Sequence, residues 1–148
     1  MTRHLCDVNV WLALLIDHHA LANPVRSWFE TVDDPGSLLV CRATQQSLLR
    51  LLTTPAVFTA YGSSPLDNQQ AWQVYEAVLA DERVAYLGTE PPGLDRYWRQ
   101  FTNRPTASPK LWMDAYLGAF ALAGGYALIT TDSAFRQFSE VQVLILGG

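Results

Sequence analysis

The sequence predicts a three-layer α/β/α fold built on a mostly parallel sheet of about five strands. Short, continuous apolar runs typical of buried strands recur along the chain, and segments with helical spacing of apolar residues separate them. The strand-like runs are residues 5–6, 38–41, 84–87, 127–131 and 141–146. Strands that alternate with helices favour a parallel sheet, because parallel neighbours need a crossover connection that a helix usually supplies.

Asp7 comes where the first predicted strand meets the first predicted helix. Leu5 and Cys6 continue the strand, and Asn9 is a suitable N-cap for the apolar run over residues 10–16. Ligands of open parallel sheets bind at the carboxyl ends of the strands. Asp7 therefore either caps the helix or belongs to a binding site at this edge, and this segment by itself leaves both interpretations open.

The remaining helices follow from capping residues and apolar spacing. They are expected to run from Pro24 through Phe29, over residues 44–52 with Thr44 as the cap, from Asp67 or Asn68 through Leu79, over residues 93–101, and over residues 110–123 before Gly124 and Gly125. Residues 55–65 and 102–109 are expected to be loops, because they are rich in turn-forming residues.

Composition limits the classes of function that the chain can serve. Its 148 residues, 49% of them hydrophobic, are enough for one domain that spans residues 1–148. The net charge of −4 excludes general attraction to nucleic acid, so nucleic-acid binding requires a local patch or a metal ion. Cys6 and Cys41 lie in apolar runs and are expected to be buried thiols of a cytoplasmic protein. The apolar runs are too short for a membrane span, so no membrane association is expected.

Three carboxylates occupy unusual positions in this pattern. Asp7 follows the first strand, Asp132 follows a later strand, and Asp114 lies inside the long helix on a face of small residues that can approach the sheet. If the two strands are parallel neighbours, Asp7 and Asp132 emerge at the same edge. Gathered carboxylates repel one another, and a divalent cation with oxygen ligands, Mg²⁺ or Mn²⁺, relieves this repulsion. Such a cation can also bind a phosphate oxygen and activate a water molecule.

The chain resembles the PIN-domain ribonucleases, and among them the toxins of bacterial VapBC-type toxin–antitoxin modules. Four segments carry the resemblance in their order and spacing, namely residues 7–11, 44–53, 112–117 and 130–135. The resemblance implies a PIN-like fold and endonucleolytic cleavage of RNA with Mg²⁺ or Mn²⁺ at a cluster of acids, which by position are Asp7, Asp114 and Asp132. It also implies a small antitoxin protein as partner, and we expect a homodimer.

The chain departs from the family at one position. The family commonly has a glutamate in the helix after the second strand, where this chain offers only Gln45 or Gln46. Gln45 is expected to be the equivalent residue because it follows Thr44. An amide oxygen can bind a metal ion or a water molecule but brings no negative charge, so a second metal ion should bind weakly.

Basic and aromatic side chains precede Asp114. Four of the ten basic residues fall within residues 96–110, interleaved with Tyr97, Trp98 and Phe101. They are Arg96, Arg99, Arg104 and Lys110. Single-stranded RNA is held by phosphate pairing and by stacking of bases on aromatic rings, so this segment is a predicted RNA-binding surface. The same residues also suit an ordinary amphipathic helix.

Three classes of function remain open from the sequence. The first is a metal-dependent endoribonuclease. The second is a haloacid-dehalogenase-like phosphatase, which also uses an aspartate after its first strand but requires another aspartate two residues later, where this chain has Asn9. The third is a PIN-like domain that binds RNA or a partner without catalysis, which the missing glutamate makes plausible.

Overall fold

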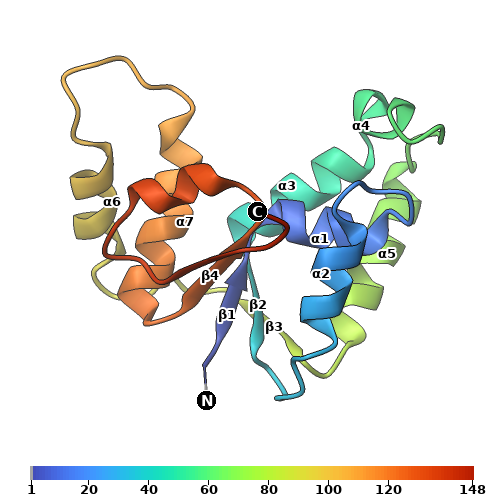
Figure 1. Ribbon diagram of the computed structural model, residues 1–148, viewed down its shortest axis with the longest axis horizontal. Coiled ribbons are helices and arrows are strands. Elements are labelled where there is room, and N and C mark those ends of the chain that lie inside the picture. Colours follow the sequence, from blue (N-terminus) through green and yellow to red (C-terminus); the bar gives the residue numbers. More distant parts are fainter. Residues whose placement is uncertain (1) are drawn as a thin grey trace.

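Five strands form one parallel sheet in the order β3-β2-β1-β4-β5 (Figure 1). The strands are β1 (His4–Cys6), β2 (Leu38–Cys41), β3 (Val84–Leu87), β4 (Ala127–Thr130) and β5 (Val143–Ile145). The computed structural model describes residues 2–148, and every strand pair within them is parallel. The predicted fold class is confirmed, although the last strand is shorter than the predicted residues 141–146.

Helices cover both faces of the sheet (Figure 1). They are α1 (Val8–Leu15), α2 (Ala22–Phe29), α3 (Arg42–Leu52), α4 (Pro55–Thr59), α5 (Asn68–Ala80), α6 (Leu94–Thr102), α7 (Leu111–Gly124) and the 3₁₀ helix η1 (Ser133–Gln137). Successive side chains of a strand point to opposite faces of the sheet. Cys6 accordingly joins a core with α1 to α5, whereas Leu5 joins a second core with α6, α7 and η1.

The helix α2 begins at Ala22, two residues before the predicted Pro24, and the starts of α1 and α3 also differ from the predicted ones. The helix α1 begins at Val8, and Asp7 caps it by accepting a hydrogen bond from the Val8 backbone N–H, so the prediction of Asn9 as the cap was wrong. The helix α3 begins at Arg42 with Cys41 as its N-cap residue, and Thr44 is buried within its first turn. In both cases the strand passes almost directly into the helix, which leaves no room for the separate cap that the sequence pattern suggested.

The segment over residues 55–65 was expected to be irregular, but its first part is the short helix α4. Pro55 stands at the start of this helix, where a fixed φ and a missing N–H are tolerated, and Phe58 anchors it in the core. Asp67 caps α5 as predicted, through a reciprocal capping box with Gln70. Cys6 and Cys41 are buried free thiols. No helix within residues 2–148 has the length and apolar character needed to cross a membrane.

The order of the strands fixes where a site can form. The chain passes from β1 to β2 on one side, whereas β4 and β5 lie on the other side of β1. The connections therefore diverge at the carboxyl ends of β1 and β4, and this divergence opens a crevice in parallel α/β sheets. The residues that directly follow these two strands are the ones best placed to line it.

Candidate metal and nuclease site

Asp7 and Asp132 follow the neighbouring strands β1 and β4, which pair in parallel as the sequence argument required. The backbone N–H of Asp7 donates to the carbonyl oxygen of Ile129 at 2.8 Å, which ties the end of β1 to β4. Both carboxylates also cap the helices that begin after them, since Asp7 accepts from the Val8 N–H at 2.7 Å and Asp132 accepts from the Ala134 N–H at 2.9 Å. Capping and membership of the acidic site are thus compatible.

Thr130 links the two acids, and the sequence analysis did not identify it. Its hydroxyl group donates to Asp7 Oδ2 at 3.0 Å, and its Oγ1 accepts from the Asp132 backbone N–H at 3.1 Å. Thr130 is fully buried at the end of β4. The signal that could have revealed it is a hydroxyl-bearing residue in an otherwise apolar strand, two residues before an acid, because a buried hydroxyl group needs a partner.

Asp114 completes the acidic group from the first turn of α7. It is half-buried and lies close enough to Asp132 and Asp7 for the carboxylates to repel one another. Burial raises the pKa of Asp7 to about 6, and repulsion from Asp114 and Asp132 adds to the increase, although the hydrogen bonds from Thr130 and Val8 oppose it. Burial and then repulsion from Asp132 also raise the pKa of Asp114. The three acids are therefore brought together as expected.

The three acids carry negative charge that no ion pair within residues 2–148 neutralises. Among residues 2–148, none of the three carboxylates forms an ion pair, although other acids of the chain do. Within the same residues, no three His, Cys, Asp or Glu side chains form a ready-made ion-binding cluster. The carboxylate oxygens and the unpaired negative charge of the three acids therefore suit a divalent cation. The acids do not by themselves form a complete coordination shell.

Two hollows meet at Asp114. The first, which we call the acid cleft, has a volume of about 430 Å³ and lies between Asp7, Asp114 and the helix α3. The second, which we call the basic cleft, has a volume of about 550 Å³ and lies between Asp114, Asp132 and the loop before α7. A chain molecule that crosses both clefts would pass directly over the acids.

The helix α3 turns a different residue toward the acid cleft from the one predicted. Gln45 is only 7% exposed, and its Oε1 accepts a hydrogen bond from Arg42 at 2.6 Å. Gln46 and Ser47 line the acid cleft instead, together with Arg50 one turn later. The structure therefore does not bring Gln45 into the cleft, because α3 begins at Arg42 and its cleft-facing side is set by that register.

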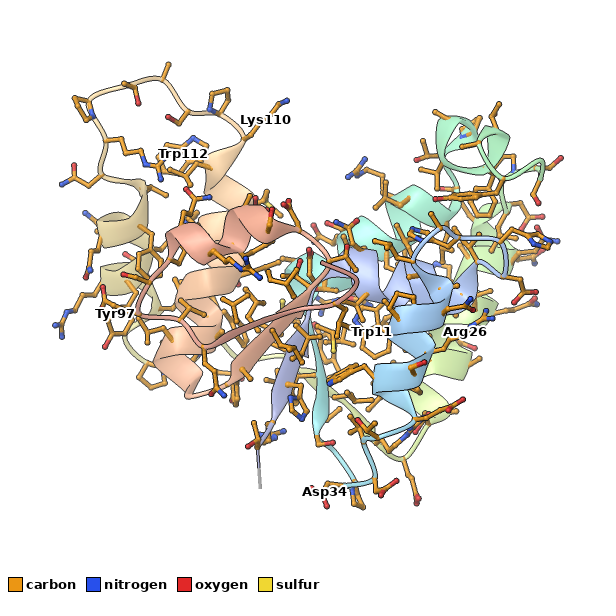
Figure 2. All side chains as sticks on the ribbon, in the orientation of Figure 1. Trp11, Arg26, Asp34, Tyr97, Lys110 and Trp112 are labelled. Atoms are coloured by element: carbon orange, nitrogen blue, oxygen red, sulfur yellow. The ribbon has the colours of Figure 1, made fainter. Side chains whose placement is uncertain are left out.

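The predicted RNA-binding residues separate into two groups. Arg104 and Lys110 line the basic cleft beside Asp114 and Asp132, and Arg104 also donates to Gln137 at 2.6 Å. Figure 2 shows Lys110 at the start of α7, where the loop from α6 returns to the body of the molecule. Arg96 and Arg99 are exposed on α6 and line neither cleft, and Arg99 pairs with Asp95 at 3.4 Å.

Comparison with known proteins agrees with this geometry. Residues 5–141 match the PIN domain, and the chain belongs to this family. It is 51% identical over 142 residues to Ribonuclease VapC41 of Mycobacterium tuberculosis strain CDC 1551, an alignment that covers 96% of this chain and 97% of the relative.

Solved structures show the same fold at low sequence identity. VapBC-1 from nontypeable Haemophilus influenzae matches with a TM-score of 0.67 and 17% identity, over 97% of this chain and 98% of that chain. VapC20 of Mycobacterium tuberculosis, described as a sarcin-ricin loop cleaving toxin, matches with a TM-score of 0.62 and 15% identity, over 95% of this chain and 98% of that one.

Proposed function

We propose that this protein is a metal-dependent endoribonuclease and the toxin of a type II toxin–antitoxin system. The observation that carries the proposal is the meeting of Asp7, Asp114 and Asp132 beside the diverging strand ends, where none of them forms an ion pair within residues 2–148. The VapC ribonuclease at 51% identity over nearly the full chain supports the activity. A phosphatase of the haloacid-dehalogenase type finds no such support.

The three acids would hold Mg²⁺ or Mn²⁺ through carboxylate oxygens. A divalent cation bound there would lower the pKa of an attacking water molecule and neutralise negative charge on the phosphate that is cut. The chain's own residues prepare the site. Thr130 fixes the Asp7 carboxylate by its hydrogen bond, and the same hydroxyl oxygen fixes the backbone before Asp132. The positions of the two strand-end acids are therefore set before any ligand binds.

The RNA chain would lie across the acid cleft and the basic cleft. Arg104 and Lys110 border the acids on one side, and Arg50 borders them on the other. These three side chains can pair with phosphates on either side of the bond that is cut. Arg96 and Arg99 lie on α6 and line neither cleft, so their contribution to RNA binding would be smaller than that of Arg104 and Lys110.

The partner proposed for this toxin is a small antitoxin, as in the VapBC complexes that share its fold. We also propose a homodimer and action in the cytoplasm, where a toxin that cuts RNA meets its substrate. Light scattering of the purified protein tests the dimer. Co-expression with the product of an adjacent small gene, followed by gel filtration, tests the antitoxin, and the absence of a complex would count against it.

Cleavage of RNA by purified protein tests the activity. Wild-type protein should cleave single-stranded RNA in Mg²⁺ or Mn²⁺ and lose this activity in a chelator. Asp114→Asn and Asp132→Asn should each lower the rate at least 100-fold while the far-ultraviolet circular dichroism stays unchanged. Glu76→Gln, an exposed acid on α5, is the matched control and should cleave at the wild-type rate.

The cleavage products separate the proposal from its competitors. Attack by water leaves no 2′,3′-cyclic phosphate, whereas attack by the neighbouring ribose hydroxyl group does. Cyclic products would refute attack by water, and full activity in a chelator would refute the role of the metal ion. RNA binding without cleavage by wild-type protein would instead support the PIN-like domain without catalysis.

A further inference from the structure

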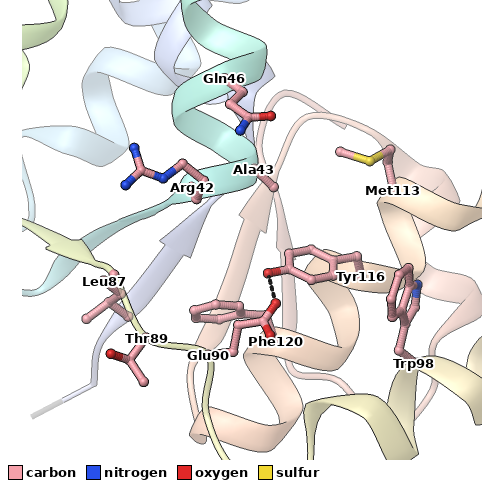
Figure 3. A pocket seen from close by; sticks show the side chains of 11 residues that line it. Arg42, Ala43, Gln46, Leu87, Thr89, Glu90, Trp98, Met113, Tyr116 and Phe120 are labelled. Carbon is pink, nitrogen blue, oxygen red and sulfur yellow. Dashed lines mark hydrogen bonds between the residues drawn. The ribbon is translucent and has the colours of Figure 1, made fainter.

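A third hollow, which we call the aromatic pocket, adjoins the acid cleft. It has a volume of about 670 Å³ and lies between α3, the residues that follow β3, and the helices α6 and α7 (Figure 3). The aromatic pocket and the acid cleft share Ala43, Gln46 and Met113 in their walls. An RNA chain held at the acids can therefore place a neighbouring nucleotide in this pocket without leaving the protein surface.

Aromatic side chains form one side of the aromatic pocket. Trp98 meets Tyr116 edge-on, with ring centroids 5.5 Å apart, and Tyr116 packs against Phe120 at 6.1 Å. The indole N–H of Trp98 also donates to the carbonyl oxygen of Trp112 at 3.0 Å. These contacts hold the rings in place before a ligand binds, so a flat base can stack there with little ordering of the protein.

A carboxylate stands among these rings. The Tyr116 hydroxyl group donates to Glu90 Oε2, as the dashed line in Figure 3 shows. Glu90 is exposed on the segment after β3, and among residues 2–148 no donor contacts its other oxygen, Oε1. An ionised carboxylate accepts hydrogen bonds but cannot donate them, so it favours a ligand edge that carries donors. Gln46 lies across the pocket and can donate or accept.

Among the four RNA bases, guanine is the one whose pairing edge carries a ring N–H and an amino group side by side. Uracil has one ring N–H between two carbonyl oxygens, and adenine and cytosine each place an amino group beside an acceptor nitrogen. A carboxylate can accept both guanine donors together, and such two-bond contacts separate one base from another by roughly tenfold or more.

On the basis of the proposed ribonuclease function, we propose that the aromatic pocket binds one unstacked guanine of the substrate. The base stacks against the aromatic side chains, and Glu90 accepts hydrogen bonds from its N1 and N2 edge. The acid cleft meets only the phosphate backbone, which is the same in every nucleotide. The aromatic pocket is then the place where the enzyme selects which bond it cuts.

Nucleotide binding tests the aromatic pocket without any cleavage. The four nucleoside 5′-monophosphates are titrated into the full chain in the presence of a chelator and followed by calorimetry. Guanosine monophosphate should bind about tenfold more tightly than the other three. Glu90→Gln should remove this difference, because the amide replaces one acceptor with a donor. Glu140→Gln, another exposed carboxylate that accepts one hydrogen bond, from Gln100, is the matched control and should keep the preference.

A second variant tests the stacking surface. Trp98→Leu should lower the binding affinity for all four nucleotides by about tenfold, because stacking on an aromatic ring depends little on which base is bound. Trp72→Leu is the control, since Trp72 is 49% exposed on α5 and lies outside the aromatic pocket. Equal binding of the four nucleotides by wild-type protein, or unchanged binding by Glu90→Gln, overturns the proposal.

Cleavage assays then connect the aromatic pocket to the reaction. RNA molecules that differ only in one guanosine are compared, and Glu90→Gln should raise KM for the guanosine substrate about tenfold with little change in kcat. Guanine preference in binding together with no RNA cleavage would refute the proposed function and support the aromatic pocket as a base site. If Glu90→Gln cleaved RNA with the base preference of the wild type, the result would support the proposed function and overturn the proposed guanine site. Weaker antitoxin binding by Glu90→Gln with unchanged cleavage would also overturn it.

Discussion

Replacing Asp7 with Asn is expected to stabilise the protein while it stops RNA cleavage. The Asp7 residue is only 6% exposed, and burial raises its pKa from an ordinary 3.8 to about 6. A carboxyl group with a raised pKa binds more protons in the folded state than in the unfolded state. Folding stability from this group is therefore fully present below the unfolded pKa and is lost as the pH rises from about 4 to about 6. The neutral amide of Asn avoids this loss.

The size of the gain follows from the pKa. The difference between a pKa of 3.8 and one of about 6 corresponds to about 3 kcal/mol at pH 7, and to less than about 1 kcal/mol at pH 4, where the Asp7 carboxyl group is largely protonated in the folded state. The Asn side chain can keep the bond from the Val8 N–H through its Oδ1 and donate its amide to Thr130 Oγ1, but the buried Thr130 hydroxyl group then loses its acceptor, which costs about 1 kcal/mol or more. The expected gain at pH 7 is therefore about 1 to 2 kcal/mol.

Urea unfolding at pH 7 and pH 4, in the presence of a chelator, measures this gain. Asp7→Asn should have the higher free energy of unfolding at pH 7, and the difference from wild type should nearly disappear at pH 4. Added Mg²⁺ should stabilise the wild type and leave the variant unchanged, because a ligand that binds only the folded state stabilises it. Asp95→Asn, an exposed control on α6, should change little at either pH. A loss of stability at pH 7, or an equal gain at both pH values, would refute the assigned burial cost of Asp7.

Three further predictions concern the surroundings of the acids. The cleavage rate should rise with pH as Asp7 ionises. Thr130→Val removes a hydrogen bond that lowers the pKa of Asp7, so this rise should move to higher pH; an unchanged pH profile would contradict this role. Gln46→Glu should lower the Mg²⁺ concentration for half-maximal cleavage, whereas Gln45→Glu, which remains buried against a guanidinium group, should not; the opposite result would show that the other glutamine faces the metal. Lys110→Gln should raise KM for RNA and make it less sensitive to salt, and an unchanged salt dependence would exclude a phosphate contact.

The sheet and two of the acids could be predicted because their signals are local. Each buried strand is a short apolar run, and Asp7 and Asp132 directly follow two of these runs. Parallel pairing then brings the ends of β1 and β4 together without any information on side-chain packing. Asp114 was harder to place because it lies on a helix, and Gly118 on the same face lies against Phe138 and Phe101, so this small residue lets aromatic rings, not a strand, approach the helix.

The surroundings of the site were predicted less well, for two physical reasons. Successive residues of a helix are rotated by about 100° from one another, so an uncertainty of one residue in α3 decides whether Gln45 or Gln46 enters the cleft. Basic residues that are close in sequence also need not share a surface. The chain leaves α6 after Thr102 and turns before α7, which takes Arg104 to the acids and leaves Arg96 on the outer helix.

The two walls of the acid cleft differ in charge because of the residues that α3 contributes. Asp7 and Asp114 make one wall negative, whereas α3 contributes Gln46, Ser47 and Arg50, which carry no negative charge and one positive charge. A second cation beside α3 would meet the Arg50 guanidinium group and lack an anionic ligand, so this wall disfavours a metal ion. A phosphate group beside α3 would meet an arginine and two hydrogen-bonding side chains, which suit its oxygens. We therefore infer that Asp7 and Asp114 would hold a single cation while Gln46, Ser47 and Arg50 would hold a phosphate, so that a glutamine in place of the family's glutamate would favour substrate binding over a second metal ion.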